Sequence, residues 1–172
     1  ALFREKGHDV YSPTREELDL TKDFTLVRSD FDIVINNGGI NPLKLVEEID
    51  DREVMQVNYQ APLSIIQQCI PYMLRRGYGR VINIISTSVK QPLKGLGVSN
   101  TIRGAVANWS KTLATELGQY GITVNNVLPG ATNTARLQSI AKIKADLYNE
   151  TVEDVLTEMG SESPMKRIAQ PE

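Results

Sequence analysis

Short apolar runs alternate with long helical patterns along the whole chain, and this alternation constrains the fold more than any other feature of the sequence. β-branched apolar residues fill residues 32–36 and 80–85, and a third run covers residues 123–128. Apolar rather than alternating runs of this kind are typical of strands that are buried on both sides. Alternating with helices, they predict an α/β fold with a mostly parallel sheet covered on both faces.

Apolar residues at helical spacing fill most of the sequence between these strands. One such pattern ends at Gly77, and glycine commonly terminates helices. Another forms an apolar stripe that contains Trp109. Residues 8–11 near the N-terminus are predicted to form a strand, and residues 16–20 are a second, weaker strand candidate. The predicted helices are residues 1–6, 47–76, 100–117 and 134–159.

Size and charge exclude several classes of protein. With 172 residues the chain is one domain or a large piece of one, so we expect residues 1–172 to form a single, incomplete domain. The 19 basic and 21 acidic residues offer no electrostatic case for binding nucleic acid. The apolar runs are far shorter than the ~20 residues of a membrane helix, and charged residues interrupt any N-terminal signal peptide. Cys69 is the single cysteine, so we expect a cytoplasmic protein without a disulfide or a metal site.

Small and polar residues follow each of the three strong strands. The carboxyl ends of parallel strands meet at one edge of a sheet, and ligands bind in the crevice outside that edge. Each group alone is an ordinary tight turn, but three such exits in succession are more than turn chemistry requires. We therefore predict that they line one rim of the sheet. The groups are Asn36-Asn37-Gly38-Gly39, Ser86-Thr87-Ser88 and Pro129-Gly130-Ala131-Thr132.

Several segments resemble, in the same order, those of the short-chain dehydrogenases/reductases. Within that family, residues 109–117 are most similar to the 3-oxoacyl-carrier-protein reductases. The resemblance implies a Rossmann-like, doubly wound parallel sheet and the reduction of a small carbonyl substrate of 3-oxoacyl type by a nicotinamide cofactor. It also implies that Ser86 acts on the carbonyl and that Asn58 holds a water of the proton relay. The matching segments are residues 32–39, 79–86, 125–130 and 164–168.

The tyrosine and lysine of the family's catalytic motif are absent. Counted from Ser86, the tyrosine position falls on Ser99 and the lysine position on Arg103. A serine hydroxyl is a far weaker acid than a tyrosine, whose pKa near ~10 is brought toward working pH by an adjacent cation. Arg103 keeps a positive charge that suits the nicotinamide ribose, but it releases no proton at physiological pH. A reductase that takes its proton from water or from a displaced group (Tyr59, Lys90 or Lys94) and a catalytically silent nucleotide-binding scaffold or regulatory homologue both stay open.

The resemblance also assigns residues to the cofactor. Asp19 and Leu20 fit the pair that flanks the adenine ring, and an aspartate that caps a helix fits Asp19 equally well. Arg15 with neighbouring hydroxyl residues suits a 2′-phosphate and thus NADP, with NAD as the alternative. Residues 16–21 also resemble nucleotide-sugar reductases and epimerases of the same superfamily, which keeps a second substrate class open. The other implied cofactor residues are Asn36, Asn37, Gly38, Gly39, Arg103, Pro129, Gly130, Thr132 and Thr134.

No glycine-rich turn of the kind that grips a pyrophosphate precedes these segments. A parallel sheet without its first strand leaves an edge unpaired and an apolar face bare, so we expect a longer protein with a mass above 19.1 kDa. The resemblance further implies that residues 134–159 form a mobile substrate lid. It also implies a homodimer or homotetramer that packs through the helices of residues 47–76 and 100–117.

Overall fold

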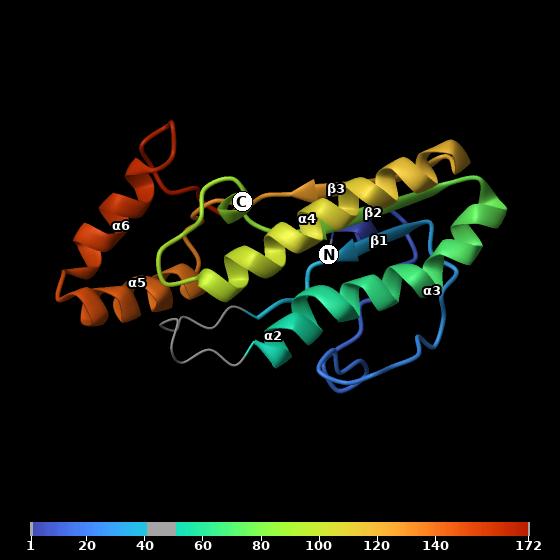
Figure 1. Ribbon diagram of the computed structural model, residues 1–172, viewed down its shortest axis with the longest axis horizontal. Coiled ribbons are helices and arrows are strands. Elements are labelled where there is room, and N and C mark those ends of the chain that lie inside the picture. Colours follow the sequence, from blue (N-terminus) through green and yellow to red (C-terminus); the bar gives the residue numbers. More distant parts are fainter. Residues whose placement is uncertain (1, 41–50, 172) are drawn as a thin grey trace.

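A three-stranded parallel sheet forms the centre of the computed structural model, which describes residues 2–40 and 51–171 (Figure 1). The strands are β1 (Ile33–Asn36), β2 (Gly79–Ile84) and β3 (Ile122–Val127), in the order β1-β2-β3. Each lies within one residue of the run that predicted it. The three strong strands and their parallel arrangement are therefore confirmed.

Two long helices lie side by side over one face of this sheet (Figure 1). The first begins with α2 (Arg52–Met55), continues through a π-helical turn η2 (Gln56–Gln60) and becomes α3 (Ala61–Arg76). Gly77 ends it in the left-handed conformation (φ 61°), as the sequence predicted. The second is α4 (Gly97–Leu117), which begins three residues earlier than predicted. Residues 47–50 of the predicted first helix lie outside the described residues.

The core lies between these helices and the inward side chains of the sheet. Val34, Val81 and Val124 come from the three strands and pack against Ile66 and Met73 of α3, with Leu117 of α4 closing the cluster. Full burial of a side chain of this size stabilises the fold by about 1.5–3 kcal/mol. Gly79 allows the close packing, since a Cβ there would lie 2.5 Å from the sulfur of Met73. The helices and the sheet are thus held together by apolar burial.

The opposite face of the sheet is open in the described part of the chain. Ile33, Ile35 and Val127 point to that face and are 40%, 44% and 47% exposed. Burial on both faces, which the apolar runs predicted, is therefore not found in residues 2–40 and 51–171. No strand of these residues pairs with the outer edge of β1, and this agrees with the predicted unpaired edge.

The N-terminal segment forms one short helix and no strand. Helix α1 (Leu2–Glu5) matches the prediction for residues 1–6, but residues 8–11 and 16–20 are not strands, so both of these strand predictions are wrong. At 16–20 a local turn competes successfully: the Thr14 amide donates to Glu17 Oε2 at 2.7 Å, and the Leu18 amide donates to the carbonyl oxygen of Thr14 at 3.0 Å. A β-branched or apolar run without a neighbouring strand has nothing to pair with.

The C-terminal lobe, residues 134–168, consists of α5 (Ala135–Tyr148) and α6 (Val152–Ser161). The single predicted helix over residues 134–159 is broken at Asn149, which is left-handed (φ 55°), and Thr151 caps the new helix with its side chain. The two helices share a small core of Ala141, Ala145 and Val155. No helix of the described residues is both long and apolar enough to cross a membrane. Two short 3₁₀ turns complete the structure, η3 (Thr87–Val89) and η4 (Gly118–Tyr120).

Candidate functional site

The three strand exits meet at one edge of the sheet, as predicted. The amide of Ile85 donates to the carbonyl oxygen of Val127 at 2.8 Å, and the amide of Thr87 donates to that of Pro129 at 3.1 Å. A Cβ on Gly130 would lie 3.8 Å from the Thr87 methyl group. These contacts join the exits of β2 and β3, and the β1 exit lies beside that of β2 through the parallel register of the two strands.

A ladder of three asparagines crosses the sheet just before its strands end. Asn36, Asn83 and Asn126 are register partners on β1, β2 and β3. Asn36 Nδ2 donates to Asn83 Oδ1 at 2.7 Å, and Asn83 Nδ2 donates to the hydroxyl of Ser110 on α4 at 2.9 Å. The Ser110 hydroxyl also lies 2.9 Å from Asn126 Oδ1. The Asn36 side chain, predicted to bind a cofactor, is thus committed to a buried network that fixes the relative positions of the strand ends.

The sequence analysis did not identify the other members of this ladder. Asn83 and Ser110 are only 2% and 1% exposed, which suits residues that hold one another. The available signal was an asparagine within two residues of the end of each predicted strand. It becomes meaningful only after the register is known, because an asparagine in a strand otherwise reads as a turn or surface residue.

Ser86 begins the turn that follows β2. Its Oγ accepts a hydrogen bond from the amide of Ser88 at 3.1 Å, so the side chain caps η3. A hydroxyl that accepts in this way keeps its own proton for a second partner. Half-buried at the meeting point of two strand exits, Ser86 is placed to donate that proton to an oxygen of a ligand.

Asn58 lies in the π-helical turn η2, where both ends of its amide are occupied. Oδ1 accepts from the Ile40 amide at 2.8 Å, and Nδ2 donates to the Ile40 carbonyl oxygen at 2.7 Å. The side chain therefore fixes the chain that leaves β1. A π-helical turn interrupts the regular hydrogen-bond ladder of a helix and is frequent at functional sites.

Arg103 projects from α4 toward the ends of β1 and β2. Its Nη1 donates to the carbonyl oxygen of Ile84 at 3.0 Å, and burial lowers the pKa of the guanidinium. A Cβ on Gly39 would lie 3.2 Å both from Arg103 Nη2 and from Asn58 Oδ1, so a larger residue would crowd the guanidinium. Ser99, one helical turn earlier on α4, is 5% exposed. The structure brings Arg103, Asn58 and Gly39 together, and their roles at a site stay predictions.

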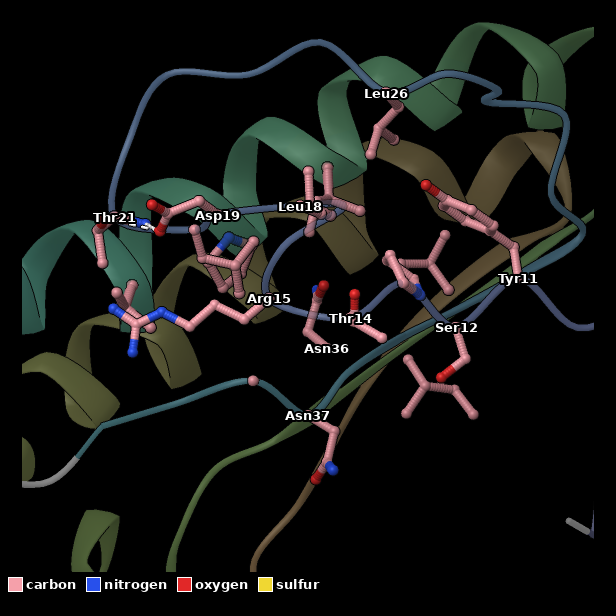
Figure 2. A pocket seen from close by; sticks show the side chains of 18 of the residues that line it. Tyr11, Ser12, Thr14, Arg15, Leu18, Asp19, Thr21, Leu26, Asn36 and Asn37 are labelled. Atoms are coloured by element: carbon pink, nitrogen blue, oxygen red, sulfur yellow. Dashed lines mark hydrogen bonds between the residues drawn. The ribbon is translucent and has the colours of Figure 1, made fainter.

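A cavity of about 520 Å³ lies between the outer edge of β1, the N-terminal segment and the start of α3 (Figure 2). Asp19, Leu20, Asn36, Asn37 and Gly38 line it, all of them predicted cofactor residues. A Cβ on Gly38 would lie 2.8 Å from the Leu20 side chain, so glycine lets the two segments approach. Apolar side chains that the sequence analysis missed complete the wall; they include Leu18, Leu26, Phe31 and Ile65.

Asp19 fixes a turn rather than a helix, so the predicted helix cap is wrong, and its predicted place beside an adenine ring stays a prediction. Its Oδ1 accepts from the hydroxyl and the amide of Thr21, at 2.7 and 3.0 Å, while Lys22 Nζ lies 3.2 Å from Oδ2. The hydrogen bonds from Thr21 lower the pKa of the Asp19 carboxyl to about 2, with a smaller contribution from Lys22. The side chain therefore fixes a turn and presents a carboxylate on the wall of the cavity at the same time (Figure 2).

Arg15 and two hydroxyl residues lie at the rim of the cavity. Figure 2 shows Arg15 and Asp19 toward one end and Tyr11 toward the other, with Thr14 between them. The Arg15 side chain is exposed, and no hydrogen bond or ion pair joins it to another described residue. Thr14 and Ser12 add hydroxyl groups to the same wall. Arg15 is a cation that suits a phosphate, and the Asp19 carboxylate at the same end would oppose one.

The remaining predicted residues lie where the chain leaves β3. The Thr132 hydroxyl donates to the carbonyl oxygen of Gly130 at 3.3 Å, and the Thr134 hydroxyl accepts from the Leu137 amide at the start of α5. Pro129 accepts from Thr87, as described above. In residues 2–40 and 51–171 no group of three or more His, Cys, Asp or Glu side chains could hold a metal ion.

Comparisons with known proteins agree with this geometry. Residues 19–145 match the model of the short chain dehydrogenase family. The chain is 32% identical over 146 residues to the short-chain reductase NovJ of Streptomyces niveus, a match that covers 82% of this chain and 53% of NovJ. Among solved structures, an actinorhodin polyketide ketoreductase with NADPH matches with a TM-score of 0.74 and 29% identity, covering 81% of this chain and 56% of that one.

A second structure, L-sorbose reductase from Gluconobacter frateurii complexed with NADPH and L-sorbose, matches with a TM-score of 0.70 and 29% identity, covering 81% of this chain and 55% of that one. The chain spans about half the length of the curated relatives that it matches. The family model, by contrast, matches well over half of this chain. The chain therefore belongs to the short chain dehydrogenase family.

Proposed function

We propose that this chain binds NADP and takes part in the reduction of a small carbonyl substrate of 3-oxoacyl type. The observation that carries the proposal is that the cavity beside β1 leads to the edge of the sheet where the strands end. The cavity lined by Asp19, Leu20 and Gly38 runs along β1, and β1 ends at the edge where Ser86 and Gly130 meet. Relatives in the family support it, because two of the matching structures contain NADPH.

The residues fit an extended dinucleotide. The walls of the cavity are apolar around Leu18 and Leu20 and carry a carboxylate at Asp19, which suits an adenine and its ribose. Arg15 at the rim favours a 2′-phosphate and hence NADP over NAD, although Glu17 lies near the Thr14 amide and would oppose an anion there. When bound, the cofactor supplies hydride. Ser86, Gly130 and Arg103 lie at the edge toward which the other end of the dinucleotide would extend.

The side chains of this chain can orient a substrate and polarise its carbonyl group, but they offer no good donor for the proton that the reduction needs. Ser86 keeps a hydroxyl proton with which it polarises a carbonyl oxygen. Arg103 adds a half-buried positive charge near the same place, but its hydrogen bond to Ile84 holds it on the main chain and its proton does not leave at neutral pH. Ser99 is too weak an acid to replace a tyrosine. In a reductase of this kind the proton therefore comes from water or from another side chain.

A second candidate function is a catalytically silent nucleotide-binding scaffold. The observation that favours it is the engagement of Asn58 with both main-chain groups of Ile40, combined with that of Arg103 with Ile84. Both side chains hold the fold together at the very positions where the proton relay of an active enzyme is expected. Binding of NADP would survive such a change, whereas turnover would not.

Titration of the purified protein with NADPH and NADH tests the binding proposal. We expect tighter binding of NADPH, and we expect Arg15→Ala to weaken NADPH about 10-fold or more while leaving NADH unchanged, because a charge-assisted hydrogen bond is worth ~1.5–3 kcal/mol. Arg75→Ala, an exposed arginine on α3, is the matched control. Absence of binding to either nucleotide would reject the proposal.

Oxidation of NADPH with acetoacetyl-coenzyme A then separates the two candidate functions. A reductase turns over in the native chain and loses activity in Ser86→Ala. A silent scaffold binds NADPH without turnover, and gains it only when Ser99→Tyr is combined with Arg103→Lys. No turnover in any of the three proteins would leave NADP binding as the whole of the function.

A further inference from the structure

We propose that Lys94 and Tyr148 form a latch that holds the C-terminal lobe against the loop carrying Ser86. The functional consequence of the latch rests on the proposed function, since the latch would control access to the proposed substrate site at Ser86. Lys94 Nζ lies 4.1 Å from the centroid of the Tyr148 ring, a cation–π contact between the loop that precedes α4 and the end of α5. Three features of the structure support it.

A neck of two paired segments joins the lobe to the body of the protein. The Asn133 amide donates to the carbonyl oxygen of Ala169 at 2.8 Å, and the Ala169 amide donates to that of Ala131 at 3.0 Å. Thr132 and Ala169 thus form a parallel bridge at the base of residues 134–168. The segments that enter and leave the lobe are hydrogen-bonded to each other there. A rotation of the lobe relative to the sheet would therefore take place at this neck.

Within the lobe, α5 and α6 pack on each other. Ala141 and Ala145 of α5 meet Val155 of α6, and Met159 packs against the same cluster. In Figure 1 both helices project beyond the end of the sheet, away from α3. A lobe with its own core behaves as one unit. A contact at the end far from the neck therefore restrains the position of the whole lobe.

Both partners of the latch are held in place by local structure. Lys94 stands in a turn closed by a hydrogen bond from the Leu96 amide to the Leu93 carbonyl oxygen, with Gly95 left-handed at φ 76°. Asn100 Nδ2 fastens that turn to α4, since it donates to the same Leu93 oxygen at 2.8 Å. The lysine is therefore presented by a fixed turn rather than by a loose loop.

Tyr148 is the last residue of α5. Asn149 reverses the chain immediately after it, and the Glu150 amide donates to the carbonyl oxygen of Ala145 at 3.0 Å. The ring consequently has a defined position at the far end of the lobe. Since the loop of Lys94 follows η3 directly, the contact connects this end of the lobe to the turn that Ser86 caps.

Hydrogen exchange of the full chain, followed by mass spectrometry without any nucleotide, tests the latch. Loss of an exposed cation–π contact of ~0.5–1 kcal/mol raises the local opening constant about 2- to 5-fold. We therefore expect Lys94→Met and Tyr148→Leu each to speed exchange in α5 and α6 by that factor, with α3 and α4 unchanged. The double variant is expected to exchange no faster than either single variant. Tyr148→Phe keeps the ring and is expected to exchange at the native rate.

Two exposed residues outside the contact provide matched controls, Lys111→Met on α4 and Tyr120→Leu in η4. Unchanged exchange in α5 and α6 for Lys94→Met and Tyr148→Leu would overturn the latch, as would the same acceleration in the controls. Additive effects in the double variant would also overturn it, because independent residues have no shared contact to lose. None of these outcomes depends on catalysis, so failure of the latch and failure of the proposed function are distinguishable.

Discussion

Truncation of the Asn83 side chain is expected to lower the free energy of unfolding, because this side chain links two other buried polar groups. Its side chain is 2% exposed, accepts from Asn36 at 2.7 Å and donates to Ser110 at 2.9 Å. Asn83→Ala would leave the buried Asn36 Nδ2 without its acceptor, whereas the Ser110 hydroxyl keeps its contacts with Val106 and Asn126. An orphaned buried polar group costs ~1–3 kcal/mol, so the variant is expected to lose about 1–3 kcal/mol of unfolding free energy. That loss is measurable against the total stability of a domain of this size, typically ~5–15 kcal/mol.

Urea unfolding followed by circular dichroism measures this loss. Asn125→Ala is the matched control, since Asn125 lies on the same sheet in an exposed position and its bond to Thr123 is a long 3.3 Å. The control is expected to change stability by no more than ~0.5 kcal/mol. A double-mutant cycle between Asn36→Ala and Asn83→Ala should give a coupling of ~0.5–3 kcal/mol. A loss below ~1 kcal/mol for Asn83→Ala, or one equal to that of the control, would refute the reasoning.

Three further predictions concern other parts of the chain. Gly121→Ala is expected to lower the thermal midpoint of unfolding, because Gly121 is left-handed (φ 72°) and a Cβ there would collide with the main-chain oxygen of Gly77; an unchanged midpoint would contradict this. The pKa of Asp19 is depressed from 3.8 to about 2, so its contribution is fully present above pH ~4 and is lost as the pH falls toward 2; urea midpoints measured across this range should fall less steeply in Asp19→Asn than in the native protein. Burial raises the pKa of the Cys69 thiol to about 11, so iodoacetamide is expected to alkylate it at neutral pH only after unfolding, as judged by intact mass.

The sequence correctly predicted the three strands that pair with one another. The two segments predicted as strands that have no neighbouring strand did not form one. β1, β2 and β3 each lie within one residue of a predicted run, because β-branched apolar residues fit a buried, pleated surface wherever they occur. Residues 8–11 contain only one β-branched apolar residue and form no strand, and no strand of the described residues lies beside them to pair with. The wrong prediction of burial for Ile33 and Ile35 has a similar reason. The described residues contain no layer that covers this face of the sheet.

The break at Asn149 was readable in principle. Asn149 as the left-handed end of one helix and Thr151 with Asp154 as the cap of the next are both local signals. The asparagine ladder and the contact of Lys94 with Tyr148 were not readable, because each joins residues far apart in the sequence whose register or distance only the folded chain defines. Local chemistry thus predicted where elements begin and end, whereas the polar contacts between elements required the structure.

Arg103 shows why binding and chemistry are separable in this site. A lysine carries its positive charge on a single nitrogen, which can approach a ligand and pass on a proton. The guanidinium of Arg103 spreads the same charge over a planar fork, one arm of which is bonded to the Ile84 carbonyl oxygen. Exchange of the lysine for arginine therefore preserves the electrostatic attraction for an anionic dinucleotide while removing a route for the proton. In the proposal above, NADP binding depends on the charge of Arg103 and carbonyl reduction on the family's tyrosine and lysine, so nucleotide affinity is expected to survive changes at Ser99 that alter turnover.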